Sequence, residues 1–381
     1  MTSHSCTRNS NPVNIFSEDR MLMKSSKRTV KPMGGEGKRD YSIDLAKAIL
    51  IFLVVWGHMI QYLHGTDYNF WEDPLFKAIY GFHMPLFAWI SGYLMYGSFQ
   101  RYEVKKLIKR RAEQLITPTI GWAAALTVVD VALNLFTHEN SSLSWIVGRL
   151  ISRLINDLWF LKAMFIACII VILLEKCFHG FWIAYIICSF LTLLSPKVCN
   201  IDLYGFVLPF FLLGFKIGEI AKKWNEKLSK NKRAGVLAVS LIAYIFLLQF
   251  FHKDNYIYTT GLGVINSEKG FFSQIMIDIY RVVVALVGCL MVLEGCSLIT
   301  KCRNFVTTVS SKTMIIYIIT TSTYIPQLIG RVGVKIVRWP ISAVIMNIIV
   351  LIPISIVMIC FALMAEIVIK KIKLGKVLLG R

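Results

Sequence analysis

The sequence predicts an all-α, polytopic integral membrane protein with about ten transmembrane helices. Apolar residues make up 56% of the 381 positions and charged residues only 17%, a balance outside the range of soluble domains. Apolar runs of about 20 residues recur after residue 43, and each is long enough to cross ~30 Å of hydrocarbon. No large soluble domain remains to be placed. The distribution of Lys and Arg, considered below, orients the spans.

The chain divides into two polar ends and one membrane domain. Residues 1–38 are rich in Ser, Asn, Lys and Arg, which predicts a disordered basic cytoplasmic tail without a signal peptide. Residues 39–370 form the transmembrane domain, and residues 371–381 are expected to be a second basic cytoplasmic tail. The expected spans have soft edges and are 44–63, 78–98, 115–136, 158–175, 180–196, 203–221, 234–252, 275–299, 305–330 and 340–366.

The net charge of +20 is explained by membrane topology. With a cytoplasmic N-terminus the inner segments hold 28 Lys and Arg and the outer loops hold 9, which predicts an N-in, C-in, multi-pass protein of the cell (inner or plasma) membrane. Most of the basic excess therefore needs no nucleic-acid partner. The nine cysteines are odd in number, lie mostly inside apolar runs and include no C-x-x-C pair, so neither structural disulfides nor zinc is expected. No other metal and no permanently bound cofactor is expected.

The first span carries three polar residues on one helix face. Lys47 and His58 are eleven residues apart, so they project within roughly 20° of each other and lie ~16 Å apart along the axis. Asp44 falls close to the same stripe. Ionisable groups are expensive inside a bilayer, so this stripe is a candidate functional site. The alternative is structural, with Lys47 reaching the membrane interface beside Asp44 and His58 hydrogen-bonded in the core.

The second span brings another histidine to a similar depth. His83 lies about five residues from the outer edge of its span, as His58 does, so antiparallel neighbours would bring the two imidazoles to one level. Such a pair indicates proton chemistry, with a structural pair as the alternative. Ser91 is followed by Gly92, and both suit helix packing better than nucleophilic catalysis because no G-x-S-x-G motif surrounds the serine.

Other polar groups in or near spans have competing interpretations. Arg110 and Arg111 at the inner end of the third span fit either the positive-inside rule or a phosphate-bearing ligand. Arg281 is three residues from Asp278, so the two side chains either neutralise each other or leave Arg281 facing a cavity. Trp159 and Lys162 are further candidates to line a central cavity.

The sequence resembles the membrane-bound acyltransferase 3 family, in particular its branch similar to fucose 4-O-acetylases and other surface-polysaccharide O-acetylases. The resemblance covers residues 40 to about 370, with specific motifs in the first 160. Its motifs are Lys47-x10-His58, Phe82-His83-Met84-Pro85-Leu86-Phe87, Ser91-Gly92-Tyr93, Arg110-Arg111 up to Pro118, and Leu158-Trp159-Phe160-Leu161. Two positions depart from the family pattern: Gln114 stands where a second arginine is common, and Thr320 where many relatives have a late histidine.

The resemblance implies acyl transfer from cytosolic acyl-CoA, most simply acetyl-CoA, to a sugar hydroxyl of a cell-surface or lipid-linked glycan. In that scheme His58 is the general base, and His83 orients the acceptor or polarises the thioester carbonyl. Lys47, Arg110 and Arg111 would hold the phosphates of the donor. The acceptor cavity would draw on a wider set, namely Asp44, Ser91, Trp159, Lys162 and Arg281.

Two other classes of function stay open at the level of sequence. A flippase or exporter of polysaccharide or lipid-linked sugar would also need a polar path through the bilayer. A membrane sensor or scaffold is less well supported, because the sequence has no soluble output domain. The acceptor sugar, the choice between acetyl and succinyl donors, direct transfer against an acyl-enzyme, and the oligomeric state are not defined by the sequence.

Overall fold

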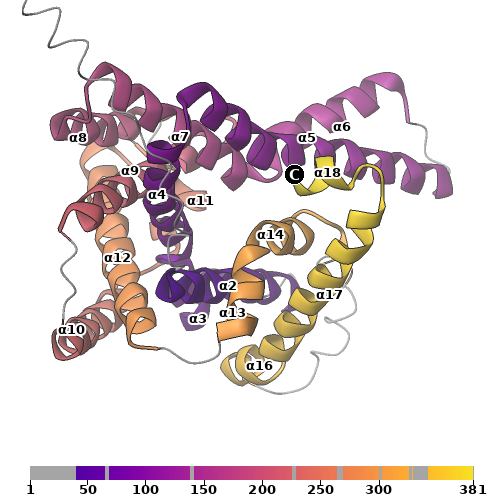
Figure 1. The fold of residues 1–381 in the computed structure, drawn as a ribbon. Coiled ribbons are helices and arrows are strands. Elements are labelled where there is room, and N and C mark those ends of the chain that lie inside the picture. The colour runs from indigo at the N-terminus through magenta and orange to yellow at the C-terminus, as the bar shows by residue number, and fades with distance from the viewer. Residues whose placement is uncertain are drawn as a thin grey trace, which may run out of the picture. The chain divides into compact units, whose positions relative to one another are not determined.

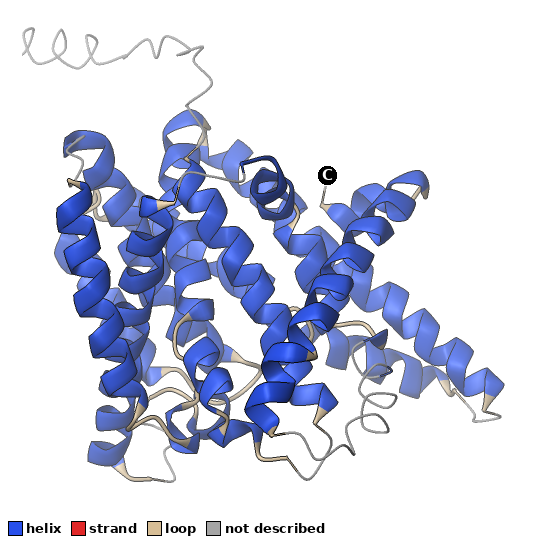
Figure 2. Cartoon of the chain, turned by 90° about the horizontal axis from the view of Figure 1, so that it is seen from below, coloured by secondary structure: helices blue, strands red, loops and turns tan. Residues whose placement is uncertain are grey.

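The computed structural model describes residues 40–64, 68–137, 141–224, 229–263, 269–299, 303–325, 328 and 342–380. All regular elements within these ranges are helical (Figures 1 and 2). The predicted tail 1–38 lies outside the described residues, and the unit that begins at Tyr41 is described by itself. Its longer helices are α2 (Tyr41–Leu63), α4 (His83–Arg101), α5 (Val104–Phe136), α6 (Leu143–Asn156), α7 (Trp159–Cys177), α8 (Trp182–Leu191), α9 (Ile201–Trp224), α10 (Lys230–Leu248), α12 (Phe271–Leu298) and α17 (Leu351–Lys371).

Shorter helices complete the described part. They are η1 (Phe70–Glu72), α3 (Pro74–Tyr80), η2 (Thr192–Leu194), η3 (Lys253–Asn255), α11 (Ile257–Thr260), α13 (Arg303–Ser311), α14 (Thr313–Thr321), α16 (Ala343–Ile349) and α18 (Gly375–Leu379).

The all-α, multi-pass class predicted from the sequence is confirmed. Within the described ranges six segments are long and apolar enough to cross a membrane, and the bent pair α6–α7 adds a seventh if it counts as one span. The six are α2, α5, residues 201–221 of α9, α10, α12, and α16 together with α17. The remaining predicted spans fall on helices that are short, broken or more polar, such as α8 and the α13–α14 pair.

Helix α2 lies at the centre of the unit. It packs against α3, α4, α12, α13, α14 and α17, and α13, α14 and α17 are neighbours of α2 in Figure 1. Its apolar positions Leu50, Val55 and Ile60 are fully buried, so the helix is stabilised on most of its circumference by packing. A polar residue in α2 consequently faces either another helix or an internal cavity.

Two predicted spans are interrupted. The span expected over 78–98 is divided into α3 and α4 by a break at Gly81 and Phe82, and the backbone leaves helical geometry at Phe82. The Tyr244 hydroxyl donates a hydrogen bond to the Ala78 carbonyl at 2.8 Å. This bond satisfies one backbone carbonyl near the break, where the regular helical pattern is interrupted. The span expected over 305–330 is divided into α13 and α14 at Lys312, and residues 326, 327, 329 and 330 lie outside the described ranges.

The segment 137–157, expected to be an outer loop, instead contains α6. Ser142 begins this helix by accepting a hydrogen bond from the Trp145 amide. Helices α6 and α7 meet at 59°, and the joint residue Leu158 has a positive φ of 49°. The joint is therefore a sharp turn between two helices, of the kind found in broken spans that line cavities.

The segment 371–381 was predicted to be a basic tail, and its described residues differ from that expectation. Helix α17 ends at Lys371, and α18 folds back onto α5, where the Trp122 indole donates to the Leu378 carbonyl at 3.0 Å. Gly380 has a φ of 64° and lies against the Gln114 carbonyl. This segment is thus part of the packed helical unit.

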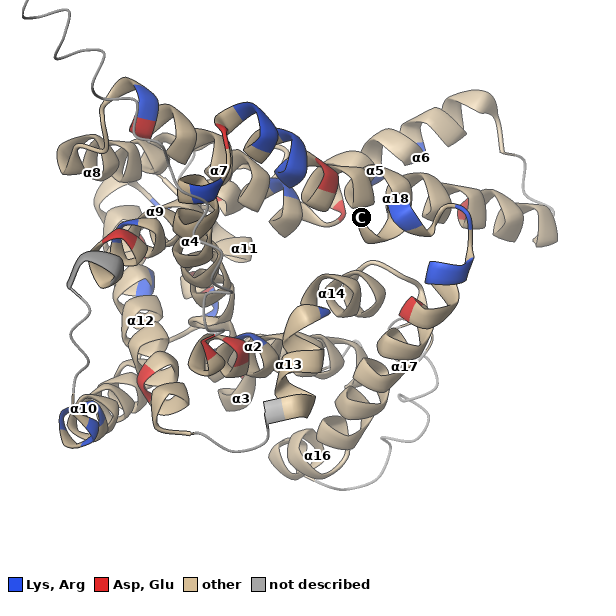
Figure 3. Cartoon of the chain, viewed as in Figure 1, with Lys and Arg blue, Asp and Glu red and all other residues tan. Residues whose placement is uncertain are grey.

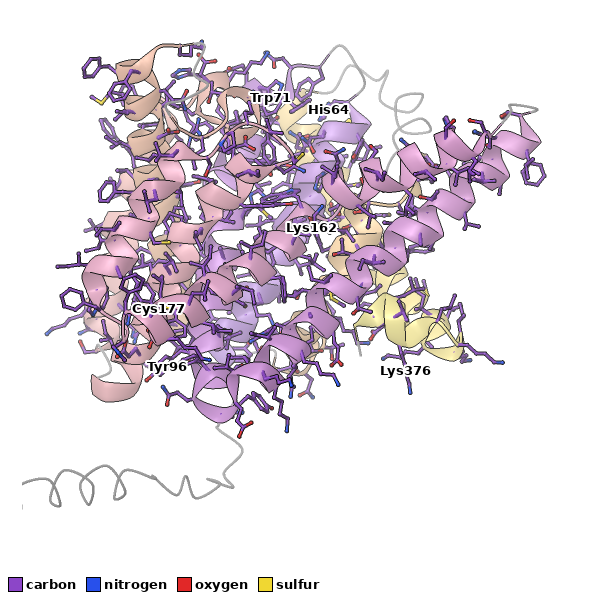
Figure 4. All side chains as sticks on the ribbon, turned by 90° about the horizontal axis from the view of Figure 1, so that it is seen from above. His64, Trp71, Tyr96, Lys162, Cys177 and Lys376 are labelled. Atoms are coloured by element: carbon purple, nitrogen blue, oxygen red, sulfur yellow. The ribbon has the colours of Figure 1, made fainter. Side chains whose placement is uncertain are left out.

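The unit has two ends, which differ in the side chains that they carry. Figure 3 shows Lys and Arg gathered on the first turns of α5, which contain Lys105, Lys106, Lys109, Arg110 and Arg111. In Figure 4, His64 and Trp71 lie at one end, Tyr96 and Lys376 lie at the other, and Lys162 lies between them. Helices α2 and α4 therefore connect the two ends, and the cavities described below lie along them.

Candidate functional site

One face of α2 borders two cavities. The lining residues of this helix are Lys47, Ile51, Val54, His58 and Gln61, spaced alternately by four and three residues. Residues with that spacing lie on a single face of a helix, as the sequence predicted for Lys47 and His58. Lys47 lines the smaller cavity and His58 the larger, so the polar stripe runs from one to the other.

The larger cavity, called the histidine cavity, has a volume of about 520 Å³ and contains both predicted histidines. His58 enters from α2 and His83 from the start of α4. Trp159, also predicted, lines the same cavity from α7. The remaining wall is rich in aromatic and polar side chains, including Gln61, Trp71, Tyr80, Asn156, Tyr258, Thr321 and Tyr324.

The orientation of His83 follows from the break between α3 and α4. Its Nδ1 lies 2.9 Å from the Ile79 carbonyl oxygen, and His83 is only 4% exposed. Because a carbonyl can only accept a hydrogen bond, the neutral imidazole carries its proton on Nδ1 and a lone pair on Nε2. His83 is therefore fixed in the tautomer whose Nε2 can accept a proton or a hydrogen bond.

The surroundings of the break are held by a hydrogen-bond network at the end of α2. Asp73 accepts hydrogen bonds from the amides of Leu75 and Phe76, which begins α3, and from the side-chain amide of Asn347 at 2.6 Å. The Tyr68 hydroxyl also donates to Asp73. Burial and this hydrogen bond raise the pKa of Tyr68, so the phenol stays protonated as a donor.

His58 has an unsatisfied polar atom inside the histidine cavity. Its Nδ1 is buried and has no hydrogen-bond partner among the described residues. The imidazole stacks on Tyr62, with ring centroids 6.1 Å apart. Buried polar atoms are normally satisfied, so an unsatisfied nitrogen on a residue that lines a cavity makes His58 a candidate ligand-binding or catalytic residue.

The smaller cavity, called the cation cavity, has a volume of about 390 Å³ and is lined by Lys47 and Arg111. Ser91 lines it from α4 and Gln114 from α5. Most of the other lining side chains are apolar, among them Phe87, Ile90, Leu94, Phe160, Met164 and Phe211, and residues Leu379 and Gly380 close part of the wall. The cavity thus combines cationic groups with an apolar channel.

The two neighbouring arginines of α5 point to different surroundings. The Arg111 guanidinium donates to Ser98 Oγ at 3.1 Å and more distantly to Gln114 Oε1 at 3.4 Å, while its buried Nε has no partner among the described residues. Arg110 is exposed and donates to the Tyr102 hydroxyl at 2.7 Å. Only Arg111 lines the cation cavity, since consecutive helical residues diverge by about 100°.

Three predicted cavity residues, Asp44, Lys162 and Arg281, have their partners outside the two cavities, and Arg281 is taken up after the other two. Asp44 is buried and accepts a hydrogen bond from Ser310 Oγ at 2.7 Å. Lys162 donates to the carbonyls of Leu154 and Ile155 at 2.6 and 2.7 Å, which satisfies the end of α6. None of these side chains lines either of the two cavities.

Arg281 pairs with Asp278, as in the structural alternative for this residue. Their charged atoms are 3.0 Å apart, and each side chain is almost fully buried. Arg281 also donates to the Gly261 carbonyl at 2.6 Å and to Thr260 Oγ1. The guanidinium therefore secures the segment before α12 and does not line either cavity, so the expectation that it faces one is corrected.

Sequence reasoning missed a charged cluster on the wall of the histidine cavity. Arg149 and Arg153 project from α6 and both bind Asp130 Oδ2 of α5, at 2.8 Å for Arg149 Nε and 2.7 Å for Arg153 Nη2. Arg153 also binds Asp157 at 2.9 Å and Tyr324 Oη at 2.8 Å. Two features of the sequence could have indicated this cluster. The arginines are four residues apart, and Asp130 lies inside an apolar run.

The two cavities adjoin at three residues. Val54, Met84 and Tyr317 are the side chains that line both of them, and they belong to α2, α4 and α14. We call this set the waist. A ligand held by Lys47 and Arg111 can therefore reach the histidines only past these three side chains or by way of a separate opening.

Comparison with known proteins gives a family match over most of the chain. A family model described as an acyltransferase domain matches residues 40–367. Nodulation protein NolL of Mesorhizobium japonicum is 35% identical over 239 residues, 62% of each chain, and NolL of Sinorhizobium fredii is 32% identical over 243 residues, 62% of this chain and 64% of that protein. Glucans biosynthesis protein C of Salmonella paratyphi B is 24% identical over 269 residues, 58% of this chain and 70% of that protein.

The chain spans less than two thirds of the length of the NolL proteins, at 62% and 64%. No solved structure gives a significant match.

Proposed function

Because the chain belongs to the acyltransferase 3 family, as its motifs predicted, we propose that it is a membrane O-acyltransferase. The proposed reaction moves an acyl group, acetyl in the simplest case, from acyl-CoA to a sugar hydroxyl of a cell-surface or lipid-linked glycan. One observation carries the proposal: a single face of α2 links a cavity with cationic side chains to a cavity with two histidines.

The cation cavity suits the donor. Arg111 lines this cavity, and the N–H groups of a guanidinium suit the oxygens of a phosphate group. Lys47 lies on the adjoining wall and adds a second positive charge. The apolar remainder of the cavity fits the thin pantetheine arm of acyl-CoA, which would extend along α2 towards His58.

The histidine cavity suits the chemistry. In the proposed reaction His58 takes the proton of the sugar hydroxyl while that oxygen attacks the thioester carbonyl carbon. The new C–O ester bond forms and the C–S bond breaks. The proton then passes from His58 to the departing sulfur, so the products are the glycan ester and CoA with a free thiol. No metal or permanently bound cofactor takes part in this scheme.

His83 is suited to positioning the acceptor. With its proton held on Nδ1 by the Ile79 carbonyl, its Nε2 is free to accept a hydrogen bond from the attacking hydroxyl. Trp159, Trp71 and Tyr258 supply flat apolar surfaces in the same cavity, and aromatic faces of this kind pack well against sugar rings. The acceptor would therefore bind here while the donor occupies the cation cavity.

The proposed orientation is the ten-span, N-in, C-in topology in the cell membrane. It directs the cation cavity, near the basic first turns of α5, to the cytosol where acyl-CoA is made. The end that carries His64 and Trp71 would then face the outer side, where the glycan arrives. Donor and acceptor would approach from opposite sides of the membrane.

Replacement of His58 tests the proposal. Membranes that contain His58→Ala should release CoA thiol from acetyl-CoA, and transfer labelled acetyl to the host's surface glycan, roughly 10²–10⁴ times more slowly than wild type. His252→Ala is the matched control, since His252 is exposed and lines neither cavity. Normal acetyl transfer by the His58 variant would overturn the mechanism, and glycan export without thioester consumption by wild type would favour a transporter.

A further inference from the structure

Tyr80, the last residue of α3, touches the surroundings of both histidines of the histidine cavity. Its ring meets the ring of His83 edge-on, with centroids 4.7 Å apart. The same ring lies against the backbone of α2 at Gly57, the residue before His58, because a Cβ atom on Gly57 would be only 2.8 Å from Tyr80 Cε2. Any larger residue at position 57 would therefore force the Tyr80 ring to shift.

The Tyr80 hydroxyl also reaches α2. It donates a hydrogen bond to Gln61 Oε1 at 3.2 Å. Gln61 lies three residues after His58 on the face of α2 that borders the histidine cavity. Its side chain also interacts with the His58 imidazole, without giving the Nδ1 of that ring a hydrogen bond. A continuous line of contacts thus runs from His83 through Tyr80 and Gln61 to His58.

The ring of Tyr80 has little room to move. It stacks on Phe76 with centroids 3.9 Å apart and meets Tyr258 edge-on at 6.2 Å. The backbone beside it is held as well, since the Ile79 carbonyl oxygen lies 2.9 Å from Nδ1 of His83. Closely packed aromatic side chains keep one position, so Tyr80 can hold His83 at a fixed place relative to α2.

We propose that Tyr80 is a positioning residue that sets the distance and orientation between His58 and His83. The proposal rests on the acyl transfer proposed above, in which both imidazoles act on one sugar hydroxyl. An error of about 1 Å in such an arrangement can cost about 100-fold in rate. Tyr80 itself takes no proton and forms no bond in this scheme. It is not part of the waist and does not line the cation cavity, so its replacement should leave donor binding unchanged.

Tyr80→Phe tests the hydroxyl and keeps the ring. His58-dependent release of CoA thiol is measured on the full-length protein in host membranes over a range of acetyl-CoA concentrations. We expect kcat to fall by about 10- to 100-fold, with an apparent KM for acetyl-CoA within about twofold of wild type. Tyr280→Phe is the matched control, because the Tyr280 hydroxyl also donates one hydrogen bond, to the Leu247 carbonyl, and Tyr280 lines neither cavity. The two variants should have similar melting temperatures in detergent.

Gly57→Ala tests the ring. The added methyl group would displace the Tyr80 ring, so kcat should fall by about tenfold or more. In the double variant Gly57→Ala/Tyr80→Ala the methyl group has room, so it should add no further loss to that of Tyr80→Ala alone. Gly97→Ala is the control, because nothing lies within 4 Å of its Cβ position. Melting temperatures of the same four proteins report the contact even where activity is too low to compare.

The outcomes separate this inference from the proposed function. Wild-type kcat in Tyr80→Phe, or a fall in kcat that Tyr280→Phe shares, would overturn the positioning role. Additive losses from Gly57→Ala and Tyr80→Ala would overturn it too, because the two residues would then act separately. A raised KM with an unchanged kcat in Tyr80→Phe would assign Tyr80 to donor binding instead. Failure of wild type to release CoA would contradict the proposed acyl transfer itself.

Discussion

Asp130 on α5 holds the buried Arg153 of α6 through a single carboxylate oxygen, at 2.9 Å from Nε and 2.7 Å from Nη2. The same oxygen accepts a hydrogen bond from Arg149 at 2.8 Å. The side chains of Asp130 and Arg153 are only 6% and 8% exposed, so this contact lies inside the protein. One acid therefore fixes α6 against α5 and shapes a wall of the histidine cavity.

Removal of Asp130 should destabilise the protein more than removal of Arg149. Asp130→Ala leaves the buried Arg153 guanidinium without its main partner, which typically costs about 3–5 kcal/mol. Arg149 is 42% exposed, and loss of an exposed ion pair costs about 1 kcal/mol or less. Thermal unfolding of the purified variants in detergent measures the difference. Equal melting temperatures for Asp130→Ala and wild type would show that the cluster does not hold α6.

Arg111 and Arg110 should differ in their effect on the donor. Arg111→Ala removes the guanidinium that lines the cation cavity, and loss of a charged phosphate contact costs about 1.5–3 kcal/mol, or roughly a 10- to 150-fold rise in apparent KM for acetyl-CoA. Arg110→Ala, which removes only the exposed contact with Tyr102, is the matched control. A rise in KM of the same size for both variants would place the donor phosphates outside the cavity.

Helical periodicity alone predicted the shared face of Lys47 and His58. Eleven residues are close to three whole turns, and α2 is a continuous helix over this range, so the residues border adjoining cavities on one face. The shared cavity of His58 and His83 also followed from the sequence, because two antiparallel spans place residues at equal distance from their outer edges at equal depth. Both predictions needed only local geometry.

The partners of several polar side chains could not be predicted from the sequence, because these partners lie far away along the chain. Lys162 satisfies the end of α6, a helix that was expected to be a loop. Arg281 binds the carbonyl of Gly261, twenty residues away. Asp130 and Arg153 come from an apolar run and a presumed loop, and only tertiary packing brings them together. Residue type therefore indicated where charge was costly, but not which neighbour compensated it.

The close contact between α4 and α9 should make Gly92 sensitive to substitution. A Cβ atom on Gly92 would lie 2.0 Å from the Phe211 carbonyl oxygen, so Gly92→Ala forces the two helices apart. A cost of about 1–3 kcal/mol or more is expected, as for other overpacked sites. Gly97→Ala in the same helix is the control, since nothing lies within 4 Å of its Cβ position, and it should leave stability unchanged or slightly raised.

Thermal unfolding in detergent distinguishes these two glycine variants directly. The expected result is a lower melting temperature for Gly92→Ala and a wild-type or higher value for Gly97→Ala. Equal losses in both variants would mean that helix propensity or insertion, and not the contact with Phe211, governs the effect.

Cysteine labelling tests the proposed N-in, C-in orientation. Lys253 and Asn231 are both exposed, and they lie at opposite ends of the segment that contains α10. Asn255, in the same turn as Lys253, is only 5% exposed and is therefore unsuited to labelling. In a background without native cysteines, Lys253→Cys should react with a membrane-impermeant maleimide added to intact cells, and Asn231→Cys should react only after the membrane is opened. The 28 Lys and Arg on the inner segments, against 9 on the outer loops, are the reason for this direction. Labelling of Asn231→Cys alone in intact cells would reverse the orientation, and labelling of both positions would remove α10 from the set of membrane-spanning helices.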